Sequence, residues 1–178
     1  MQRTPPPAPQ STPPPAPARL PAIRSLVMTA MIREQILLHL LDETPNEGVG
    51  LLAVASELTA DGAAAATRFF PGTNIDASPA RFTMDPAEVM SAIREIEANG
   101  WRLGAIVHSH ITSPATPSAT DLREANYPDA LLLIVSFASH PSAMRAWRID
   151  REDEMQMVRA VPIEIPPVAR RDTRPPRS

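Results

Sequence analysis

The chain of 178 residues contains no cysteine. This absence excludes disulfide bonds, thiolate metal ligands and a cysteine nucleophile. A metal ion would therefore be held by histidine and carboxylate side chains, and the nucleophile of a hydrolytic reaction would be water or a serine or threonine hydroxyl. Lysine is also absent, since all 17 basic residues are arginine, so no side chain of this protein can accept an isopeptide-linked modifier.

A strong net charge and a long apolar segment are missing as well. The formal net charge is -3, which indicates no general attraction to nucleic acid or to an anionic membrane. The longest apolar run, around residues 130–135, is far shorter than the ~20 residues that span a bilayer. Prolines stand where a secretory signal peptide needs an apolar stretch. We therefore expect a cytoplasmic protein that binds neither nucleic acid nor membrane.

Proline is concentrated at the two ends of the chain. Residues 1–22 contain nine prolines among small and polar residues, a composition that cannot bury enough apolar area to fold. We expect a disordered proline-rich arm over 1–25, which serves as a stiff spacer rather than as a ligand for an SH3-like domain. A single domain over 26–165 and a flexible basic tail over 166–178 would follow.

Between the ends, the hydrophobic pattern alternates between helix and strand periods. Apolar residues at four-residue spacing predict a helix over 31–43, and Asp85-Pro86-Ala87-Glu88 predicts the first turn of a second helix that ends at Asn99-Gly100. A third, short helix is expected over 118–126. The order of elements predicts an α/β (α+β) fold with a mixed β-sheet flanked by helices. The expected strands are 48–55, 65–70, 81–84, 103–108, 131–137, 144–149 and 155–163.

His108 and His110 end the expected strand 103–108. Because side chains of a strand alternate between its faces, two residues at this spacing point to the same side, with Cα atoms roughly 6.6 Å apart. Two imidazoles so placed can bind one zinc ion. Asp121 begins the next helix, where the intervening loop could return its carboxylate as a third ligand. Three protein ligands leave one zinc position open for water, as a catalytic site requires.

Hydrolysis of a peptide bond also needs a group that takes the proton of the water and returns it to the leaving amine. Glu47 precedes the expected strand 48–55, which we expect to pair with the histidine-bearing strand, and it is the best-placed carboxylate. Ser118 could donate a hydrogen bond to the oxyanion that forms at the scissile carbonyl.

Each of these residues has an ordinary structural interpretation when taken alone. Ser118 and Asp121 have the spacing of a capping box, Glu47 could be a turn carboxylate, and a His-x-His pair is often coincidental. The other two histidines, His39 and His140, lack such neighbours and are expected to be structural or solvated. The combination of types and spacings favours a metal centre.

The same residues resemble the pattern of the JAMM/MPN+ zinc metallopeptidases, in particular the small prokaryotic members. That pattern is a glutamate on an early strand, then His-x-His, a short loop, and Pro-Ser-x-x-Asp; it matches Glu47, residues 108–110 and residues 117–121. The segments 45–52 and 74–86 are similar to the surroundings of the family motif. The resemblance implies an MPN/cytidine-deaminase-like architecture, one Zn2+ per chain on His108, His110 and Asp121, and catalytic roles for Glu47 and Ser118.

Two positions depart from the family pattern. The family usually has proline after the second histidine, where this chain has Ile111, and often cysteine where Val49 stands. Neither change removes a ligand, so we expect an effect on loop stiffness rather than on chemistry.

The resemblance also implies a substrate. It is a peptide or isopeptide bond after the C-terminal glycine of a ubiquitin-like or sulfur-carrier protein that ends in Gly-Gly. The short connection from Asp121 to Leu131 leaves no room for the extra ubiquitin-recognition segments of eukaryotic relatives. A carrier–cysteine adduct, an isopeptide conjugate and a precursor remain open as substrates, and so does the oligomeric state, a dimer included. The alternative function is a non-catalytic MPN-type binding module for a ubiquitin-like partner; a deaminase is disfavoured because that chemistry uses His-x-Glu and cysteine ligands.

Metal binding by histidine requires the neutral imidazole. We therefore predict that zinc occupancy and cleavage both decline as the pH falls below about 6.5, the ordinary pKa of histidine. Metal content after dialysis at a series of pH values, measured beside cleavage rates, tests this. Zinc retained in full at about pH 4.5 would contradict ligation by two histidines.

Overall fold

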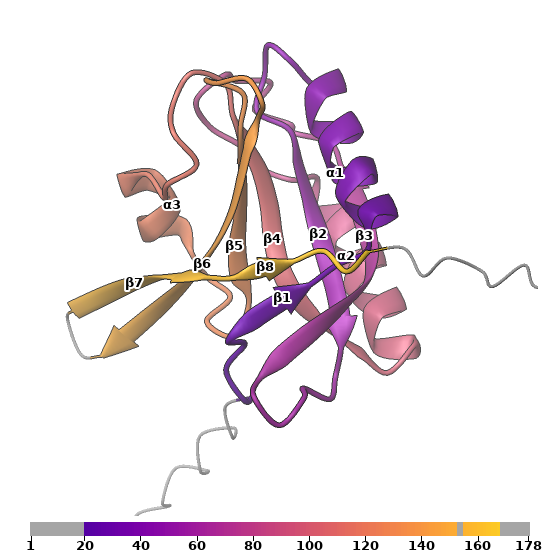
Figure 1. Ribbon diagram of the computed structural model, residues 1–178. Helices are drawn as coiled ribbons and strands as arrows, with labels where there is room; N and C mark the ends of the chain where they lie inside the picture. Colours follow the sequence, from indigo (N-terminus) through magenta and orange to yellow (C-terminus); the bar gives the residue numbers. More distant parts are fainter. Residues whose placement is uncertain (1–19, 153–154, 168–178) are drawn as a thin grey trace, which may run out of the picture.

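The computed structural model describes residues 20–152 and 155–167. In these residues, three helices and an eight-stranded mixed sheet form one α/β arrangement (Figure 1). The sheet flanked by helices confirms the predicted fold class. In chain order the elements are β1 (Ser25–Val27), α1 (Ala30–Asp42), β2 (Val49–Ala55), β3 (Ala63–Gly72), α2 (Pro86–Ala98), β4 (Trp101–His110), α3 (Ala119–Glu124), β5 (Leu131–Ser136), β6 (Ala143–Glu152), β7 (Met155–Val161) and β8 (Ile163–Glu164).

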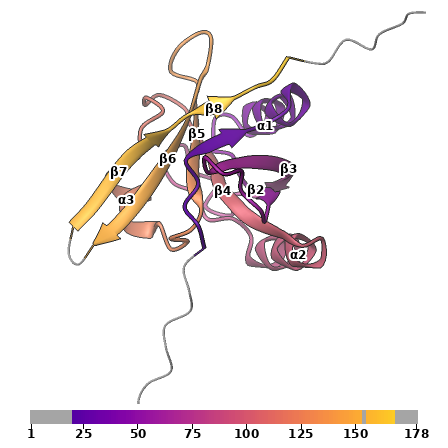
Figure 2. The ribbon, with the colours of Figure 1, turned by 60° about the horizontal axis from the view of Figure 1, so that its bottom comes forward.

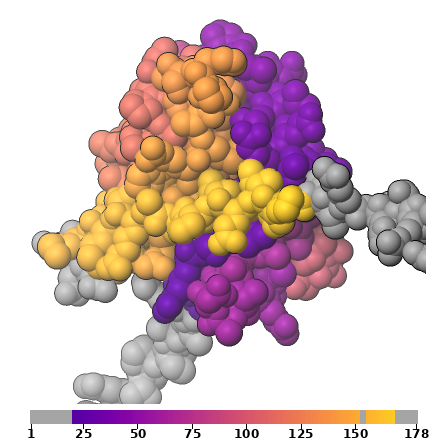
Figure 3. All heavy atoms as spheres, viewed as in Figure 1, coloured from indigo at the N-terminus to yellow at the C-terminus, as the bar shows by residue number. Residues whose placement is uncertain are grey.

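The sheet is curved so that its two edges meet. Its strand order is β7-β6-β5-β4-β2-β3-β1-β8, yet only Pro162 separates β7 from β8 in the sequence. This extended segment therefore pairs with β6 on one side and with β1 on the other, where the Leu26 amide donates to the Pro162 carbonyl at 2.8 Å. Figure 3 shows the segment as a yellow band across the molecule.

Helix α1 packs against the inner face of the curved sheet. Thr29 begins the helix by accepting a hydrogen bond from the Ile32 amide at 3.2 Å, as an N-cap residue does. Ile32, Ile36 and Leu40 are buried at four-residue spacing and belong to the largest apolar cluster, with residues from β1 to β7. This confirms the helix expected over 31–43.

Helix α2 covers the opposite face of the sheet (Figure 2). Asp85 caps it by accepting from the Ala87 amide at 2.7 Å, and Pro86 occupies the first turn, as the sequence predicts. Ala92 and Ile96 pack on a second cluster of buried residues from β2, β3 and the segment before the helix. The helix therefore closes the side of the sheet that also carries the histidines of β4.

Strands β2, β4 and β5 form the centre of the sheet and position the site. β2 runs antiparallel to β4 with Val49 opposite His108, and β5 runs parallel to β4 with Ile134 opposite the same residue. Every residue of β5 is buried, as expected for a strand covered on both faces. The predicted pairing of the strand after Glu47 with the histidine-bearing strand is confirmed.

The expected strand over 81–84 is wrong. In this segment Met84 forms only an isolated bridge with Asn74, because the Asn74 side chain takes up the Arg81 carbonyl and the Thr83 amide. The sequence also missed β1 and β8, which are too short to show a period. The expected strand over 155–163 is two strands that part at Pro162.

The packed structure starts a little before residue 26. Ile23 is 1% exposed, and β1 begins at Ser25. The remainder of the proline-rich arm (residues 1–19) and most of the basic tail (168–178) lie outside the described residues. In residues 20–152 and 155–167, none of the helices has both the length and the apolar character that crossing a bilayer requires.

A matched pair of leucines in α1 tests the packing. Leu40 is 0% exposed and Leu38 is 61% exposed. We predict that Leu40→Ala lowers the free energy of unfolding by about 2–5 kcal/mol, because it leaves a cavity under the sheet. Leu38→Ala should change it by less than about 0.5 kcal/mol. Urea denaturation of both variants measures the difference, and equal effects would contradict the position of α1.

Candidate metal centre

His108 and His110 end β4 on the face that α2 covers, and their imidazoles converge. The two Nε2 atoms lie 3.2 Å apart, so the predicted orientation to one side of the strand is confirmed. His108 is 0% exposed and stacks on Phe82, with ring centroids 4.5 Å apart. His110 is 5% exposed. Both rings are therefore held in the protein interior.

Asp121 reaches the histidines from the first turn of α3. Ser118 caps this helix: its Oγ accepts from the Asp121 amide at 3.1 Å, and its own amide donates to Asp121 Oδ2 at 2.7 Å. The capping box turns the carboxylate toward β4, where Oδ1 lies 3.4 Å from His108 Nε2 and Oδ2 lies 3.4 Å from His110 Nε2. The capping box predicted from the Ser-x-x-Asp spacing is present, and it brings the Asp121 carboxylate to the two histidines.

The loop between β4 and α3 orients the second imidazole. His110 Nδ1 lies 2.7 Å from the Pro114 carbonyl oxygen, which can only accept, so this nitrogen carries the hydrogen. The Nε2 atom that faces Asp121 is then an unprotonated acceptor in the neutral ring. A carbonyl that fixes the outer nitrogen is the usual support of a metal-ligating histidine. Ile111, in place of the family's proline, does not prevent this contact.

Burial and proximity shift the pKa values of all three groups. Complete burial lowers the pKa of His108 below its ordinary value, although Asp121 opposes this. Burial also acts to lower the pKa of His110, but the Asp121 carboxylate and the Pro114 carbonyl stabilise the protonated ring and raise its pKa overall. Burial acts to raise the pKa of Asp121, but the two histidines, which donate to it when they are protonated, hold it well below its usual range. The carboxylate is therefore ionised.

The three side chains fit a tetrahedral metal ion. Two ligand atoms about 2.1 Å from one ion, at the tetrahedral angle, are separated by about 3.4 Å. The two Nε2 atoms are 3.2 Å apart, and each lies 3.4 Å from one of the two Asp121 oxygens; one nitrogen or oxygen from each residue lies within 4.8 Å of the others. The unprotonated Nε2 of a neutral His110 and the ionised Asp121 carboxylate face one another in a buried site, and two such acceptors require a cation or a proton between them. The donor set of two imidazoles and a carboxylate suits zinc.

Glu47 lies at the start of β2, beside this cluster. It is 7% exposed, and burial raises its pKa to about 7, with the charge of His110 opposing and that of Asp121 adding to the shift. Its neighbour Gly48 forms two bonds with Ser109, the residue between the histidines. These two bonds of the adjacent residue hold the Glu47 backbone beside the histidine pair.

Asn74 holds the chain around Glu47 and was not identified as a site residue from the sequence. It is 6% exposed. Its amide nitrogen donates to the carbonyls of Glu47 and Arg81 at 2.8 and 3.0 Å, and its oxygen accepts from the amides of Asp76 and Thr83 at 3.1 Å each. The only signal for Asn74 in the sequence is its place among turn residues, shortly before Ser78-Pro79-Ala80-Arg81-Phe82. That signal does not reveal which groups its side chain would bind.

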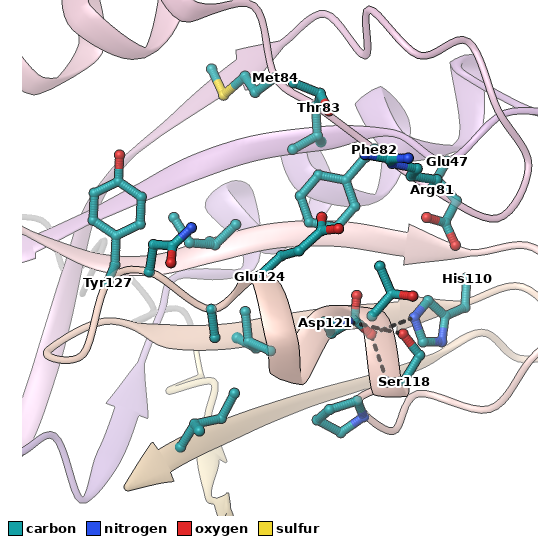
Figure 4. Close-up of a pocket in the computed structure, with 18 of the residues that line it drawn as sticks. Glu47, Arg81, Phe82, Thr83, Met84, His110, Ser118, Asp121, Glu124 and Tyr127 are labelled. Carbon is teal, nitrogen blue, oxygen red and sulfur yellow. Dashed lines mark hydrogen bonds and ion pairs between the residues drawn. The ribbon is translucent and has the colours of Figure 1, made fainter. Parts of the chain in front are cut away.

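A cavity of about 920 Å³ opens over the four carboxylate and imidazole groups. Glu47, His110, Ser118 and Asp121 line it at one end, and Tyr127 lies at the other (Figure 4). Apolar residues make up much of the remaining wall, among them Val49, Leu51, Phe82, Met84, Ile106 and Leu132. All five predicted site residues are thus brought together, His108 beneath the cavity wall and the other four on it.

Comparison with known proteins agrees with this geometry. The family model for prokaryotic homologs of the JAB domain matches residues 29–150. The chain belongs to this family. The matched range includes Glu47, both histidines and Asp121, so the JAB domain contains the whole candidate site.

Curated relatives of this JAB domain are peptidases. A probable TtuB-protein conjugate cleaving protease of Thermus thermophilus is 38% identical over 53% of this chain and 59% of its own length. The CysO-cysteine peptidase of Mycobacterium tuberculosis is 31% identical over 70% of this chain and 82% of its own. A desampylase of Haloferax volcanii is 34% identical over 62% of this chain and 80% of its own length. These relatives support a hydrolase.

The fold of the JAB domain also occurs in solved structures. A protein from Desulfitobacterium hafniense superposes with a TM-score of 0.68 at 32% identity, covering 79% of this chain and 92% of that one. A protein from Salinibacter ruber superposes with a TM-score of 0.57 at 29% identity, covering 80% and 92%.

Asn74→Ala tests the support of the site. Removal of this amide leaves buried carbonyls and amides without partners, and we predict a loss of about 1–3 kcal/mol in the free energy of unfolding. Asn99→Ala, which removes one exposed bond to the Glu95 carbonyl, should cost less than about 1 kcal/mol. Urea denaturation compares them. An Asn74→Ala protein as stable as the wild type would show that the amide does not hold this loop.

Proposed function

We propose that this protein is a zinc-dependent peptidase or isopeptidase. The observation that carries the proposal is the convergence of three buried side chains, whose donor atoms lie within 4.8 Å of one another, beside a cavity whose wall also contains a separate buried carboxylate. His108, His110 and Asp121 would hold one Zn2+ per chain. When bound, the ion would supply Lewis acidity that polarises water and the scissile carbonyl.

Glu47 would serve as the general base and then as the general acid. It is buried on the cavity wall, outside the group of three ligands, so its carboxylate is available to take a proton from water and return it to the leaving amine. Its pKa of about 7 suits both directions of transfer near neutral pH; a cation beside it would lower this value. An exposed glutamate would titrate well below neutral pH.

Ser118 would stabilise the oxyanion. Its Oγ accepts a hydrogen bond from the Asp121 amide, which leaves the hydroxyl hydrogen to point into the cavity that Ser118 lines. A donor fixed in this way contributes to catalysis because it need not reorient as charge develops on the substrate.

The tail of a small protein would occupy the apolar length of the cavity. The length of the cavity between Phe82 and Tyr127 (Figure 4) suits an extended peptide. Glycine at the scissile position would let the substrate backbone approach the metal ligands closely. Relatives named for TtuB-protein conjugates and for CysO-cysteine support a ubiquitin-like or sulfur-carrier protein with a Gly-Gly end as the acyl part of the substrate.

Two substitutions separate metal binding from proton transfer. We predict that Glu47→Gln retains zinc but cleaves a carrier fusion about 100-fold or more slowly, because the amide cannot accept the proton. His108→Ala should lose both zinc and cleavage. Zinc content by elemental analysis and product by mass spectrometry measure the two effects.

Glu57→Gln is the matched control, since Glu57 is exposed and lies beyond the opposite end of β2 from Glu47, and it should behave as wild type. A Glu47→Gln protein that cleaves at the wild-type rate would refute the mechanism. Binding of the carrier without any product by the wild type would favour a non-catalytic MPN-type module instead.

A further inference from the structure

The two ends of the cavity differ in character. Beyond Asp121 the cavity continues past Glu124 toward Tyr127 (Figure 4), and Met84, Ile106 and Leu132 are among the apolar residues of its lining. At the other end Arg81 lines the cavity together with Glu47, and Figure 4 draws the two in the same corner, opposite Tyr127. The longer side, toward Tyr127, offers the length that an extended acyl tail needs. With the tail on that side, the leaving group lies at the end that contains Arg81.

Hydrogen bonds fix Arg81 next to the proton-transfer group. The Asn74 amide donates to the carbonyl oxygens of both Glu47 and Arg81, and the Glu47 amide donates to the Ser78 carbonyl at 2.8 Å. The backbones of Glu47 and Arg81 are thereby held to one side chain. A leaving amine within reach of Glu47 has its own substituents within reach of Arg81.

The Arg81 guanidinium has hydrogen-bond donors that its ion pair with Asp76 does not use. Asp76 is the one carboxylate within ion-pair distance in residues 20–152 and 155–167, with Oδ2 at 3.6 Å from Nε. That same oxygen already accepts from the Thr83 hydroxyl at 2.6 Å. The Arg81 side chain is 60% exposed. Asp76 thus contacts the guanidinium from its Nε side, and the exposed remainder belongs to a side chain that lines the cavity.

An α-carboxylate is the group that this position can recognise. In an amino acid the carboxylate is on the carbon next to the amine, and a guanidinium binds a carboxylate through two parallel hydrogen bonds. In an isopeptide the leaving amine is at the end of the four-carbon stem of lysine, which has no carboxylate at that position.

We propose that Arg81 binds the free α-carboxylate of the leaving residue, and so directs this protein to carrier tails joined to a single amino acid. This inference depends on the proposed peptidase function. Cleavage adds water across the scissile amide: the carrier regains its C-terminal carboxylate, and the amino acid leaves with its α-amine and its α-carboxylate. Arg81 takes no part in the proton transfers.

Three substrates with the same carrier test it. The carrier ends in Gly-Gly and is joined to an amino acid with a free carboxylate, to the same amino acid as a carboxamide, or through the ε-amine of a lysine peptide. We expect wild type to prefer the carboxylate over the carboxamide by about tenfold in kcat/KM. Arg81→Met should abolish this preference, chiefly by raising KM for the carboxylate substrate, and leave the other two rates unchanged.

Two further variants sharpen the result. Arg81→Lys keeps the charge without the two parallel donors and should retain part of the preference. Arg94→Met removes an exposed arginine of α2 outside the cavity and should retain all of it. Zinc content and the circular dichroism spectrum of each variant establish that the site and fold are intact.

Equal cleavage of carboxylate and carboxamide by wild type would overturn the role of Arg81 while leaving the peptidase function in place. An Arg81→Met protein slowed to the same degree on all three substrates would show that Arg81 only supports the loop, which also overturns it. If wild type cleaves none of the three substrates, the proposed function fails, and this inference fails with it.

Discussion

The site depends on the pairing of Gly48 with Ser109. The Ser109 amide donates to the Gly48 carbonyl at 3.0 Å, and the Gly48 amide donates to the Ser109 hydroxyl at 2.8 Å. Because Ser109 lies between the two histidines and Gly48 follows Glu47, this register brings the Glu47 carboxylate beside the two imidazoles. A slip of one residue would turn every side chain to the other face of the sheet and separate the carboxylate from the imidazoles.

Two loops complete the candidate site beside the sheet, and in each loop one polar group fixes the conformation. The Pro114 carbonyl orients His110, and the Asn74 amide holds the turn that carries Arg81. Buried polar groups are costly unless they are paired, so these contacts specify one loop conformation each. The two carboxylates, Glu47 and Asp121, then share a buried space, and each disfavours the charge of the other. A dication would relieve this repulsion and use the bare imidazole nitrogens.

Much of the architecture could be predicted from the residues, and the exceptions have physical causes. Periods of two and of about four residues indicated the central strands and both long helices, and the two-residue spacing of His108 and His110 indicated one face. The position of Asp121 required the family resemblance, since a loop separates it from the histidines. The segment 81–84 was misassigned because the Asn74 side chain binds the Arg81 carbonyl and the Thr83 amide, and pairing with the neighbouring backbone is limited to one isolated bridge. The short strands β1 and β8 have too few residues for any period.

Because β8 follows β7 directly after Pro162 and pairs with β1, the sheet cannot close until the last strand has been synthesised. Strand β1 is synthesised before all the other strands. One of its two neighbours in the sheet, β8, lies almost at the end of the described chain, where Ile163 pairs with Leu26. Until those last residues have left the ribosome, one side of β1 is an open edge that another chain could join. Contacts this distant in sequence also slow folding. A nascent chain therefore contains Glu47, both histidines and Asp121 before it has a closed sheet to hold them.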